Sequence, residues 1–298
     1  MEYNSEEQVI RLCLEKLSAQ YGRKIIVERK HPVGGGCINS ALRLKCNAGD
    51  FFLKWNSSCP ADMFLKEAAG LQEIHSVGIS YLRIPEIIWA KETDELPGVL
   101  LMEYLQPSDG SSEQDEKLGL GLAMLHRKTA PGYGFYHDNY CGLTVQKNTW
   151  NTNWIEFFGQ QRLLYLLHMV QHSRGISSEE IKIFEKFIDR LPEILSHPTA
   201  PSLIHGDLWS GNYMYTAGGP SLIDPAAYYA DREMELSIMT MFGGFSSRVW
   251  AAYQEAFPLS DGWKERNRVY QLYHLLNHYY LFGGSYLDQA NRIVRQFI

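Results

Sequence analysis

Leu203-Ile-His-Gly-Asp-Leu-Trp-Ser-Gly-Asn212 is the stretch around which the rest of this 298-residue chain is organised. Leu222-Ile-Asp-Pro-Ala226 follows at short distance, so that Asp207 precedes Asn212 by five residues and Asp224 by seventeen. Transfer of the terminal phosphoryl group of ATP requires a carboxylate that holds the acceptor hydroxyl and oxygen ligands that place Mg²⁺ between the phosphates. The order therefore predicts a phosphotransferase site, with Asp207 as catalytic residue and Asn212 and Asp224 as metal ligands.

Protein kinases show the same spacing between their catalytic aspartate and metal-binding asparagine. Here His-Gly-Asp replaces their His-Arg-Asp, and Asp-Pro-Ala replaces their Asp-Phe-Gly, which points away from ordinary protein kinases. Each residue taken alone has an alternative interpretation, because Gly-Asp and Gly-Asn pairs are common in turns. The ordered set of three favours catalysis.

The composition is that of a globular enzyme rather than a fibre or a disordered chain. Hydrophobic residues make up 45% and charged residues 21% of the chain, and its length suits two lobes. The net charge of −6 argues against nucleic acid or an anionic membrane as partner, because both require clustered Lys and Arg. The five scattered cysteines favour free thiols. Without a signal-peptide pattern or a long apolar run, we expect a cytoplasmic protein, monomeric or weakly dimeric.

The first part of the chain alternates between helical and strand patterns. A helix is expected over residues 5–20, and a strand, glycine loop, strand, hairpin and strand over residues 25–55. Gly34, Gly35 and Gly36 would let backbone N–H groups approach phosphate oxygens, although a tight hairpin is the alternative.

A lysine and a glutamate in this part have the spacing of a kinase ion pair. Lys54 ends the third strand, where its ammonium can pair with phosphates, although strand lysines are usually exposed. A helix is expected from Asp62, as its cap, to His75. It carries Glu67, which would orient Lys54 as in kinases or lie on the helix surface.

Two more strands, at residues 84–89 and 99–105, complete the small sheet that we expect. The polar segment that follows marks a lobe boundary, giving an ATP-binding lobe at residues 1–105 and a catalytic lobe at residues 106–298. Backbone groups of Glu103, Tyr104 and Leu105 would then face the adenine ring. An ordinary strand end is the alternative.

The second part is mainly helical, so the fold class that we expect is α+β with two lobes. Helical spacing covers residues 118–127, 154–172, 178–195, 234–241, 248–255 and 263–282. Between the first two lies a loop, residues 131–150, rich in aromatic residues and glycine, and loops of this length tend to be functional. Its Asp138, Asn139 and Gln146 would suit a polyhydroxylated ligand, or the loop packs on the surface.

Together these motifs resemble the fructosamine kinase (ketosamine-3-kinase) family, which is related to aminoglycoside phosphotransferases and choline kinases within the protein-kinase-like fold. The segments that carry the resemblance are Gly34-Gly-Gly-Cys-Ile-Asn39, Tyr133-Gly-Phe-Tyr-His-Asp-Asn-Tyr140, Asn148-Thr-Trp150, His205-Gly-Asp-Leu-Trp-Ser-Gly-Asn212, Asp224-Pro-Ala-Ala-Tyr-Tyr229, Met241-Phe-Gly-Gly-Phe245 and Leu276-Asn-His278.

The resemblance implies an ATP- and Mg²⁺-dependent kinase that phosphorylates the 3-hydroxyl of ketosamines, on small amines or protein lysines, and so leads to deglycation. In that case the substrate contacts are expected at Asp138, Asn139, Tyr140, Trp209 and Tyr228. Val145 and the pair Ala230-Asp231 depart from the family pattern near the expected sugar side, so the sugar is left open. Cys37 in the glycine loop is a redox-active or an inert thiol. A kinase for an aminoglycoside or choline, or a silent nucleotide-binding scaffold, are the alternative functions.

Overall fold

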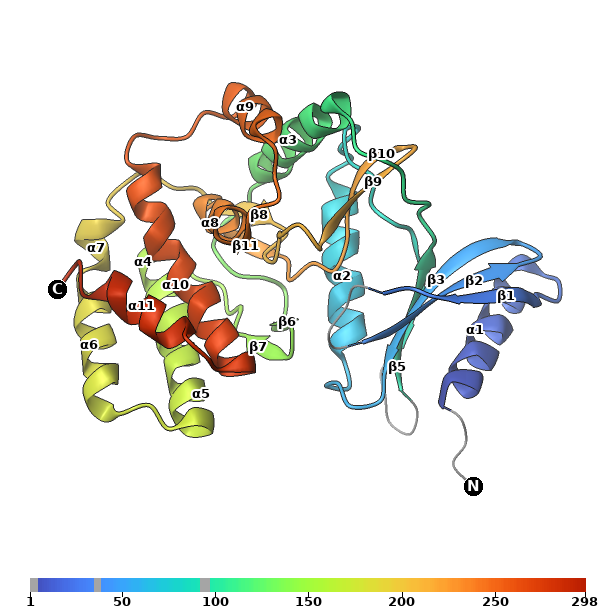
Figure 1. Ribbon diagram of the computed structural model, residues 1–298, viewed down its shortest axis with the longest axis horizontal. Helices are drawn as coiled ribbons and strands as arrows, with labels where there is room; N and C mark the ends of the chain where they lie inside the picture. The colour runs from blue at the N-terminus through green and yellow to red at the C-terminus, as the bar shows by residue number, and fades with distance from the viewer. Residues whose placement is uncertain (1–4, 35–38, 92–96) are drawn as a thin grey trace.

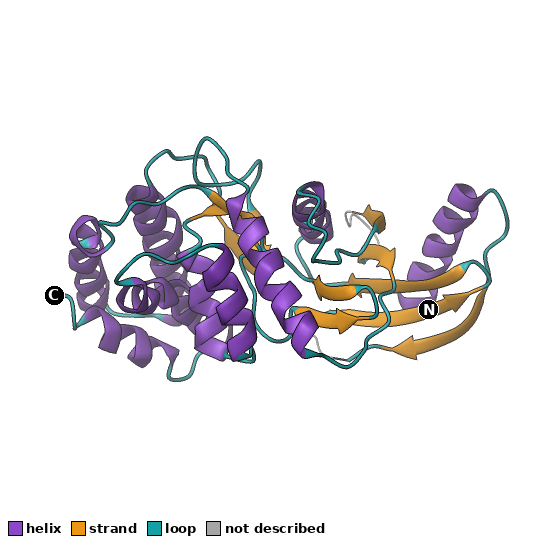
Figure 2. Cartoon of the chain, turned by 90° about the horizontal axis from the view of Figure 1, so that it is seen from above, coloured by secondary structure: helices purple, strands orange, loops and turns teal. Residues whose placement is uncertain are grey.

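The structure is a computed structural model and describes residues 5–34, 39–91 and 97–298. An antiparallel five-stranded sheet and helix α1 (Ser5–Tyr21) form one end of the molecule, and most other helices form the opposite end (Figure 1). Helix α2 (Met63–Ser76) lies between them, and the two termini are at opposite ends. Seen from above, the same separation of strands and helices is plain (Figure 2).

The sheet has the strand order β1-β2-β3-β5-β4, and every neighbouring pair is antiparallel. Its strands are β1 (Val27–Pro32), β2 (Ser40–Cys46), β3 (Gly49–Asn56), β4 (Ile87–Lys91) and β5 (Gly98–Glu103). Along β3, Phe51, Leu53 and Trp55 pack in the same buried cluster as α1. Because side chains alternate between the faces of a strand, Lys54 points to the opposite face, where α2 packs.

Helix α2 forms because its apolar residues recur at helical spacing and meet the sheet with one face. Phe64, Ala68, Leu71 and Ile74 are buried there, and Glu67 lies on the same buried stripe. The expectation that Asp62 stands at the cap of this helix is confirmed. Asp62 occupies the cap position, but its carboxylate accepts a hydrogen bond from the Tyr140 hydroxyl at 2.6 Å instead.

The rest of the chain consists of helices around one large hydrophobic core, with three two-stranded sheets at its edge. The short strands are β6 (Asn139–Cys141), β7 (Thr144–Gln146), β8 (Ser202–Ile204), β9 (Tyr213–Thr216), β10 (Gly219–Leu222) and β11 (Tyr228–Ala230). The helices are α3 (Ser112–Arg127), α4 (Trp154–Glu156), α5 (Tyr165–Arg174), α6 (Ser178–Asp189), α7 (Leu191–Ile194), α8 (Glu233–Phe242), α9 (Ser247–Ala256), α10 (Trp263–Phe282) and α11 (Tyr286–Val294). The α+β class is confirmed.

Residues 154–172 do not form the single regular α-helix that their apolar spacing predicts. A π-helical segment, η1 (Phe157–Leu164), separates α4 from α5. The wider π turn shifts the side chains that follow it around the helix axis. Arg162 within this segment is completely buried.

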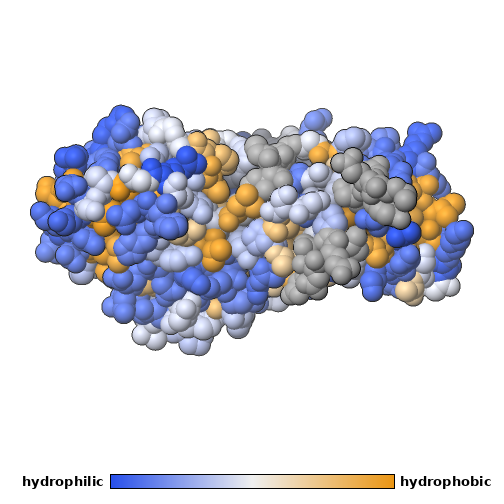
Figure 3. All heavy atoms as spheres, turned by 90° about the horizontal axis from the view of Figure 1, so that it is seen from below, coloured by the Kyte–Doolittle hydropathy of each residue, from blue (hydrophilic) through white to orange (hydrophobic). Residues whose placement is uncertain are grey.

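The surface is predominantly polar on the face shown in Figure 3, where hydrophobic residues form small separate areas. Scattered apolar residues of this kind are normal on globular proteins. Among the described residues, no helix has the length and apolar character needed to cross a membrane.

Candidate active site

Lys54, Glu67 and Asp224 meet between the sheet, α2 and the chain that follows β10. The Lys54 ammonium nitrogen lies 3.0 Å from each carboxylate oxygen of Glu67 and 2.9 Å from Oδ1 of Asp224. Lys54 and Glu67 are buried, whereas the Asp224 side chain keeps 39% of its surface exposed. The alternatives of a surface lysine and a surface glutamate therefore do not hold. One cation is shared by two carboxylates that come from different parts of the chain.

Burial and the shared Lys54 ammonium act in opposite directions on the pKa values of Glu67 and Asp224. Burial raises the pKa of Glu67 to about 7, although Lys54 opposes the shift. Burial also disfavours the ionised form of Asp224, but the Lys54 ammonium outweighs this and keeps the pKa of Asp224 below its ordinary value. Asp224 is therefore an anion at neutral pH, the state that a metal ligand requires.

The backbone around the His-Gly-Asp motif is fixed by a buried carboxylate. Glu235 of α8 accepts hydrogen bonds from the N–H groups of His205 and Gly206, the latter at 3.1 Å. Gly206 has φ +84°, and a Cβ at this position would lie 2.2 Å from the Ala226 carbonyl oxygen, so only glycine fits. The His205 carbonyl accepts a bond from the Ala226 N–H at 2.9 Å, which ties the motif to the chain after Asp224.

Asp207 and Asn212 face each other within one turn of chain. Asn212 Nδ2 donates to the backbone oxygen of Asp207 at 2.7 Å and to its Oδ2 at 3.1 Å. Burial raises the pKa of Asp207 to about 8, and the Glu235 and Asp224 carboxylates add to the shift while Asn212 opposes it. A cation bound nearby would favour the ionised form again.

The hairpin of β9 and β10 explains the spacing between Asn212 and Asp224. Tyr213 of β9 pairs with Leu222 of β10. Asn212 and Ile223, which flank this pair, continue the ladder, because the Ile223 N–H donates to the Asn212 carbonyl at 3.0 Å. The eleven residues between the two predicted metal ligands thus fold back and return Asp224 to the neighbourhood of Asn212.

Part of the predicted nucleotide site can be described. Gly34 is exposed, and apart from its chain neighbours no atom of the described residues lies within 4 Å of a Cβ built on it. Gly35, Gly36 and Cys37 lie outside the described residues. Glu103 ends β5, and the Tyr104 N–H makes a 3.4 Å bond to Asp50. The Leu105 N–H donates to no group in the described part of the chain, so it is available to a ligand.

The five residues predicted to contact substrate differ in what they offer. Trp209 is exposed beside Asp207, while Asp138 pairs with Lys147 and Tyr140 with Asp62. Asn139 and Tyr228 are buried. Asn139 makes hydrogen bonds within the protein, and the ring of Tyr228 lies beneath the guanidinium of Arg162. We therefore retain Trp209, Asp138 and Tyr140 as candidate substrate residues and not Asn139 or Tyr228.

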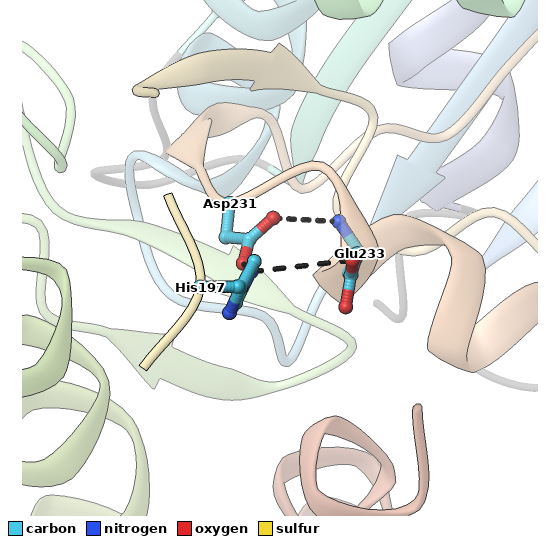
Figure 4. A group of neighbouring side chains, drawn as sticks. All are labelled: His197, Asp231 and Glu233. Carbon is cyan, nitrogen blue, oxygen red and sulfur yellow. Dashed lines mark hydrogen bonds and ion pairs between the residues drawn. The ribbon is translucent and has the colours of Figure 1, made fainter. Parts of the chain in front are cut away.

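His197, Asp231 and Glu233 form a second polar cluster, whose ligand atoms lie within 4.8 Å of one another (Figure 4). Their oxygens are already engaged: Asp231 accepts bonds from His197, Tyr270 and the Glu233 N–H. Arg266 binds both oxygens of Glu233. With the carboxylates committed to these donors, the cluster is a packed internal network and not a metal site. It also explains Asp231 structurally, without a role on the sugar side.

The comparison with known families agrees with this site. The sequence profile described as fructosamine kinase matches residues 10–298 of the chain. The chain belongs to the fructosamine kinase family. One relative, named "Probable ketoamine kinase", is from Enterococcus faecium and is 36% identical over 268 residues, which cover 89% of this chain and 94% of the relative. The chloroplastic protein-ribulosamine 3-kinase of Arabidopsis thaliana is 36% identical over 280 residues, covering 93% and 85%.

Solved structures place this fructosamine kinase family member in the same fold. A candidate fructosamine-3-kinase of Thermobifida fusca is 30% identical, with a TM-score of 0.81 over 95% of this chain and 98% of that one. A candidate fructosamine-3-kinase of Haemophilus somnus gives a TM-score of 0.85 at 25% identity, over 96% of each chain. An aminoglycoside phosphotransferase in complex with AMP-PNP and hygromycin B shares the fold alone, at 16% identity, with a TM-score of 0.64 over 95% and 97%. The predicted family and protein-kinase-like fold are confirmed.

Sequence reasoning missed two buried residues of this family member's site, Glu235 and Arg162, and gave no role to Asn148, although Asn148 begins one of the segments that carry the resemblance. Glu235 binds the His-Gly-Asp backbone, and Arg162 donates to Asn148 Oδ1 at 2.7 Å. Glu235 lies far in sequence from the backbone that it binds, and Arg162 lies in a segment without a recognisable motif. The one available signal was a glutamate at an otherwise apolar helix position.

Proposed function

We propose that this protein is an ATP-dependent ketosamine kinase that phosphorylates the 3-hydroxyl of a sugar joined to an amine as a ketosamine. The observation that carries the proposal is the meeting of Lys54, Glu67 and Asp224 next to Asp207 and Asn212 in a member of the fructosamine kinase family. The names of relatives, ketoamine kinase and protein-ribulosamine 3-kinase, support the acceptor class. Loss of the unstable 3-phosphate would then reverse glycation.

In this proposal Asp207 orients the acceptor hydroxyl and takes its proton as the acceptor oxygen bonds to the terminal phosphorus of ATP and the bond from that phosphorus to ADP breaks. Positioning contributes most, because holding acceptor and phosphate in line removes much of the entropic barrier. Lys54, oriented by Glu67, binds the α and β phosphates. Gly34, with Gly35 and Gly36 outside the described residues, would cover them. The Leu105 N–H, which has no partner in the described part of the chain, would read the adenine together with backbone groups of Glu103 and Tyr104.

Mg²⁺ fits the residues present. Asn212 uses its Nδ2 atom on Asp207, and its Oδ1 atom accepts no bond from any residue that the structure describes. Asp224 is ionised and two-fifths exposed. These two oxygen ligands would hold the ion, which supplies charge neutralisation for the phosphates.

The finer parts of the proposal concern the substrate and the setting. Both a free ketosamine and a glycated lysine on a protein are candidate acceptors, with Trp209, Asp138 and Tyr140 on the acceptor side. We place the reaction in the cytoplasm and expect a monomer or weak homodimer. Gel filtration with light scattering measures the second of these directly.

ADP release in the presence of Mg²⁺ tests the function. Fructoselysine, ribuloselysine and erythruloselysine are compared with aminoglycosides and choline at equal concentration, and Asp207→Ala is the control for contaminating kinases. We expect turnover on at least one ketosamine that the variant lacks. Faster turnover on an aminoglycoside or choline, or nucleotide binding without any acceptor-stimulated ADP release, would refute the assignment.

A further inference from the structure

We propose that Asn139, Gln146 and Asn148, called the amide clamp below, are positioning residues that hold the backbone after Asp224 and so fix the predicted metal-binding carboxylate. The proposal rests on the function proposed above, because it assigns a role within that same site. It gives the aromatic and glycine-rich loop that contains these residues a task other than contacting the sugar.

The clamp contacts the chain after Asp224 through main-chain carbonyls. Asn139 Nδ2 donates to the Ala227 carbonyl at 2.8 Å, and Gln146 Nε2 donates to the Ala226 carbonyl at 3.3 Å. Asn139 Oδ1 accepts from Gln146 Nε2 at 3.0 Å and from Asn148 Nδ2 at 2.8 Å. Both acceptor sites of Asn139 Oδ1 and one of the two N–H groups of Nδ2 are thus used inside the protein, and the residue is 3% exposed, so a sugar hydroxyl has no access to it.

Burial makes this arrangement rigid. The three clamp side chains are between 1% and 3% exposed, and Asn139 and Gln146 stand opposite each other in the β6–β7 hairpin. Leaving one such buried group without its partner costs about 1–3 kcal/mol, so alternative rotamers are disfavoured. The amides therefore hold one geometry, and the carbonyls that they bind are held with them.

Arg162 reinforces the clamp from the side of the π-helical segment. Its guanidinium donates to Asn148 Oδ1 and also lies 4.1 Å from the centre of the Tyr228 ring. No carboxylate lies within ion-pair distance of Arg162 in the described ranges, so its charge is balanced by carbonyl oxygens and aromatic faces. The same side chain thus binds the clamp and the segment that the clamp holds.

The held segment, residues 225–229, is also fixed by backbone contacts on two sides. Gly134 and Tyr229 exchange N–H to carbonyl bonds of 2.9 and 2.8 Å. On the other side α2 approaches so closely that a Cβ on Gly70 would lie 3.3 Å from both Pro225 and Ala227. Since α2 carries Glu67, the clamp also sets where Asp224 lies relative to the Lys54 ion pair.

Asn139→Asp tests the proposal with the smallest change of shape. The variant keeps both accepted hydrogen bonds and replaces the donation to the Ala227 carbonyl by repulsion between oxygens. Asn277→Asp is the matched control, because Asn277 is equally buried and binds Thr144 and Cys141 of the same hairpin without touching the held segment. Gln146→Glu, which keeps the acceptor for the Tyr273 hydroxyl, serves as a second variant if Asn139→Asp does not fold.

Hydrogen exchange and metal binding are measured first, since neither needs an acceptor. We expect amides of residues 222–230 to exchange at least about 10-fold faster in Asn139→Asp, and Mn²⁺ affinity of the ATP-bound protein, from electron paramagnetic resonance, to fall by about 10-fold. With a ketosamine that the wild type phosphorylates in the ADP-release assay, we expect kcat of Asn139→Asp to fall by about 10- to 100-fold while its KM for that acceptor stays within about two-fold of the wild-type value. Asn277→Asp leaves exchange in this segment, Mn²⁺ affinity and kcat near wild type.

Unchanged exchange and Mn²⁺ affinity in Asn139→Asp, or equal losses in Asn277→Asp, would overturn the clamp. A raised KM for the acceptor with unchanged kcat in Asn139→Asp would also overturn the clamp, because it would show that Asn139 binds the substrate instead of positioning the backbone. The outcomes for the two proposals are separable. Absence of ketosamine turnover in the wild type, with the expected exchange and Mn²⁺ results, would refute the ketosamine function alone.

Discussion

Replacing Lys54 by methionine isolates the contribution of the shared cation, and its effect can be worked out from the structure. Among the described residues, Lys54 is the one cation within ion-pair distance of Glu67 and Asp224. Breaking a buried ion pair by removing one partner costs about 3–5 kcal/mol. Asp224 is partly solvated, so the cost comes mainly from Glu67, and we expect a loss of about 3 kcal/mol at pH 8.5.

The pH dependence gives this prediction its sign. The pKa of Glu67 is about 7 with Lys54 present, and loss of the ammonium raises it further. In the variant, folded Glu67 therefore keeps a proton that the wild type releases as the pH rises above 7. The destabilisation grows with pH, by up to about 1.4 kcal/mol per unit, and is smallest near pH 6.

Urea unfolding of nucleotide-free wild type and Lys54→Met at pH 6.5 and pH 8.5 measures the effect. Lys45→Met is the matched control, because Lys45 lies exposed on the neighbouring strand β2. The wild type at each pH serves as the reference, which removes the titration of other groups from the comparison. Equal losses in the two variants, or a Lys54→Met loss that shrinks as the pH rises, would refute the reasoning.

Three further substitutions test other parts of the site and core. Asp207→Asn removes the group that we propose as proton acceptor, so we expect kcat to fall by about 10²- to 10⁴-fold. Calorimetry should show unchanged ATP affinity, and a parallel loss of ATP binding would contradict the assignment. Glu235→Gln places an amide group against the N–H donors of His205 and Gly206, so the free energy of unfolding, measured in urea, falls by about 1–3 kcal/mol. Unchanged stability would show that the His-Gly-Asp backbone does not depend on this carboxylate. Burial lowers the pKa of His274 to about 3, so below pH 6.5 the unfolded state takes up a proton that the folded state does not, which costs about 2 kcal/mol of stability at pH 5. Between pH 7.5 and pH 5, the free energy of unfolding of His274→Leu should therefore fall by about 2 kcal/mol less than that of the wild type. An equal fall in both proteins would show that His274 is not the cause.

The prediction that Lys54 and Glu67 approach each other came from the kinase pattern of a strand lysine and a helix glutamate, with exposure of both as the alternative, and the periodicity of the two elements agrees with it. Alternation along β3 puts Lys54 opposite the apolar residues that face α1, and helical spacing puts Glu67 in line with Phe64 and Leu71. The motif spacing predicted that Asp207, Asn212 and Asp224 belong together, because it matches the order of the catalytic and metal-binding residues of kinases. The hairpin that returns Asp224 to Asn212 is a finding of the structure. Their roles in the reaction stay predictions.

The amide clamp could not be predicted, because its partners lie elsewhere in the chain. Asn139 and Gln146 are polar residues in a loop, where exposure is the ordinary expectation. They are buried because carbonyls more than 75 residues later supply their hydrogen bonds. No local pattern contains that information. The π-helical segment around Arg162 is a similar case, since its apolar spacing is compatible with a regular α-helix.

Exposed aromatic side chains lie near the held segment, residues 225–229, whose backbone the buried amide clamp fixes. Tyr136, Trp150 and Trp209 are exposed aromatic residues in this region. Trp150 contacts Tyr229 of the held segment, Tyr136 contacts Trp150 edge to face at 5.6 Å, and Trp209 follows Asp207 by two residues. Under the function proposed above, substitutions there would alter the surface that a sugar or its amine meets and leave the amide clamp in place. We therefore expect a mutant library restricted to these three positions to change acceptor preference without disturbing the phosphoryl-transfer geometry.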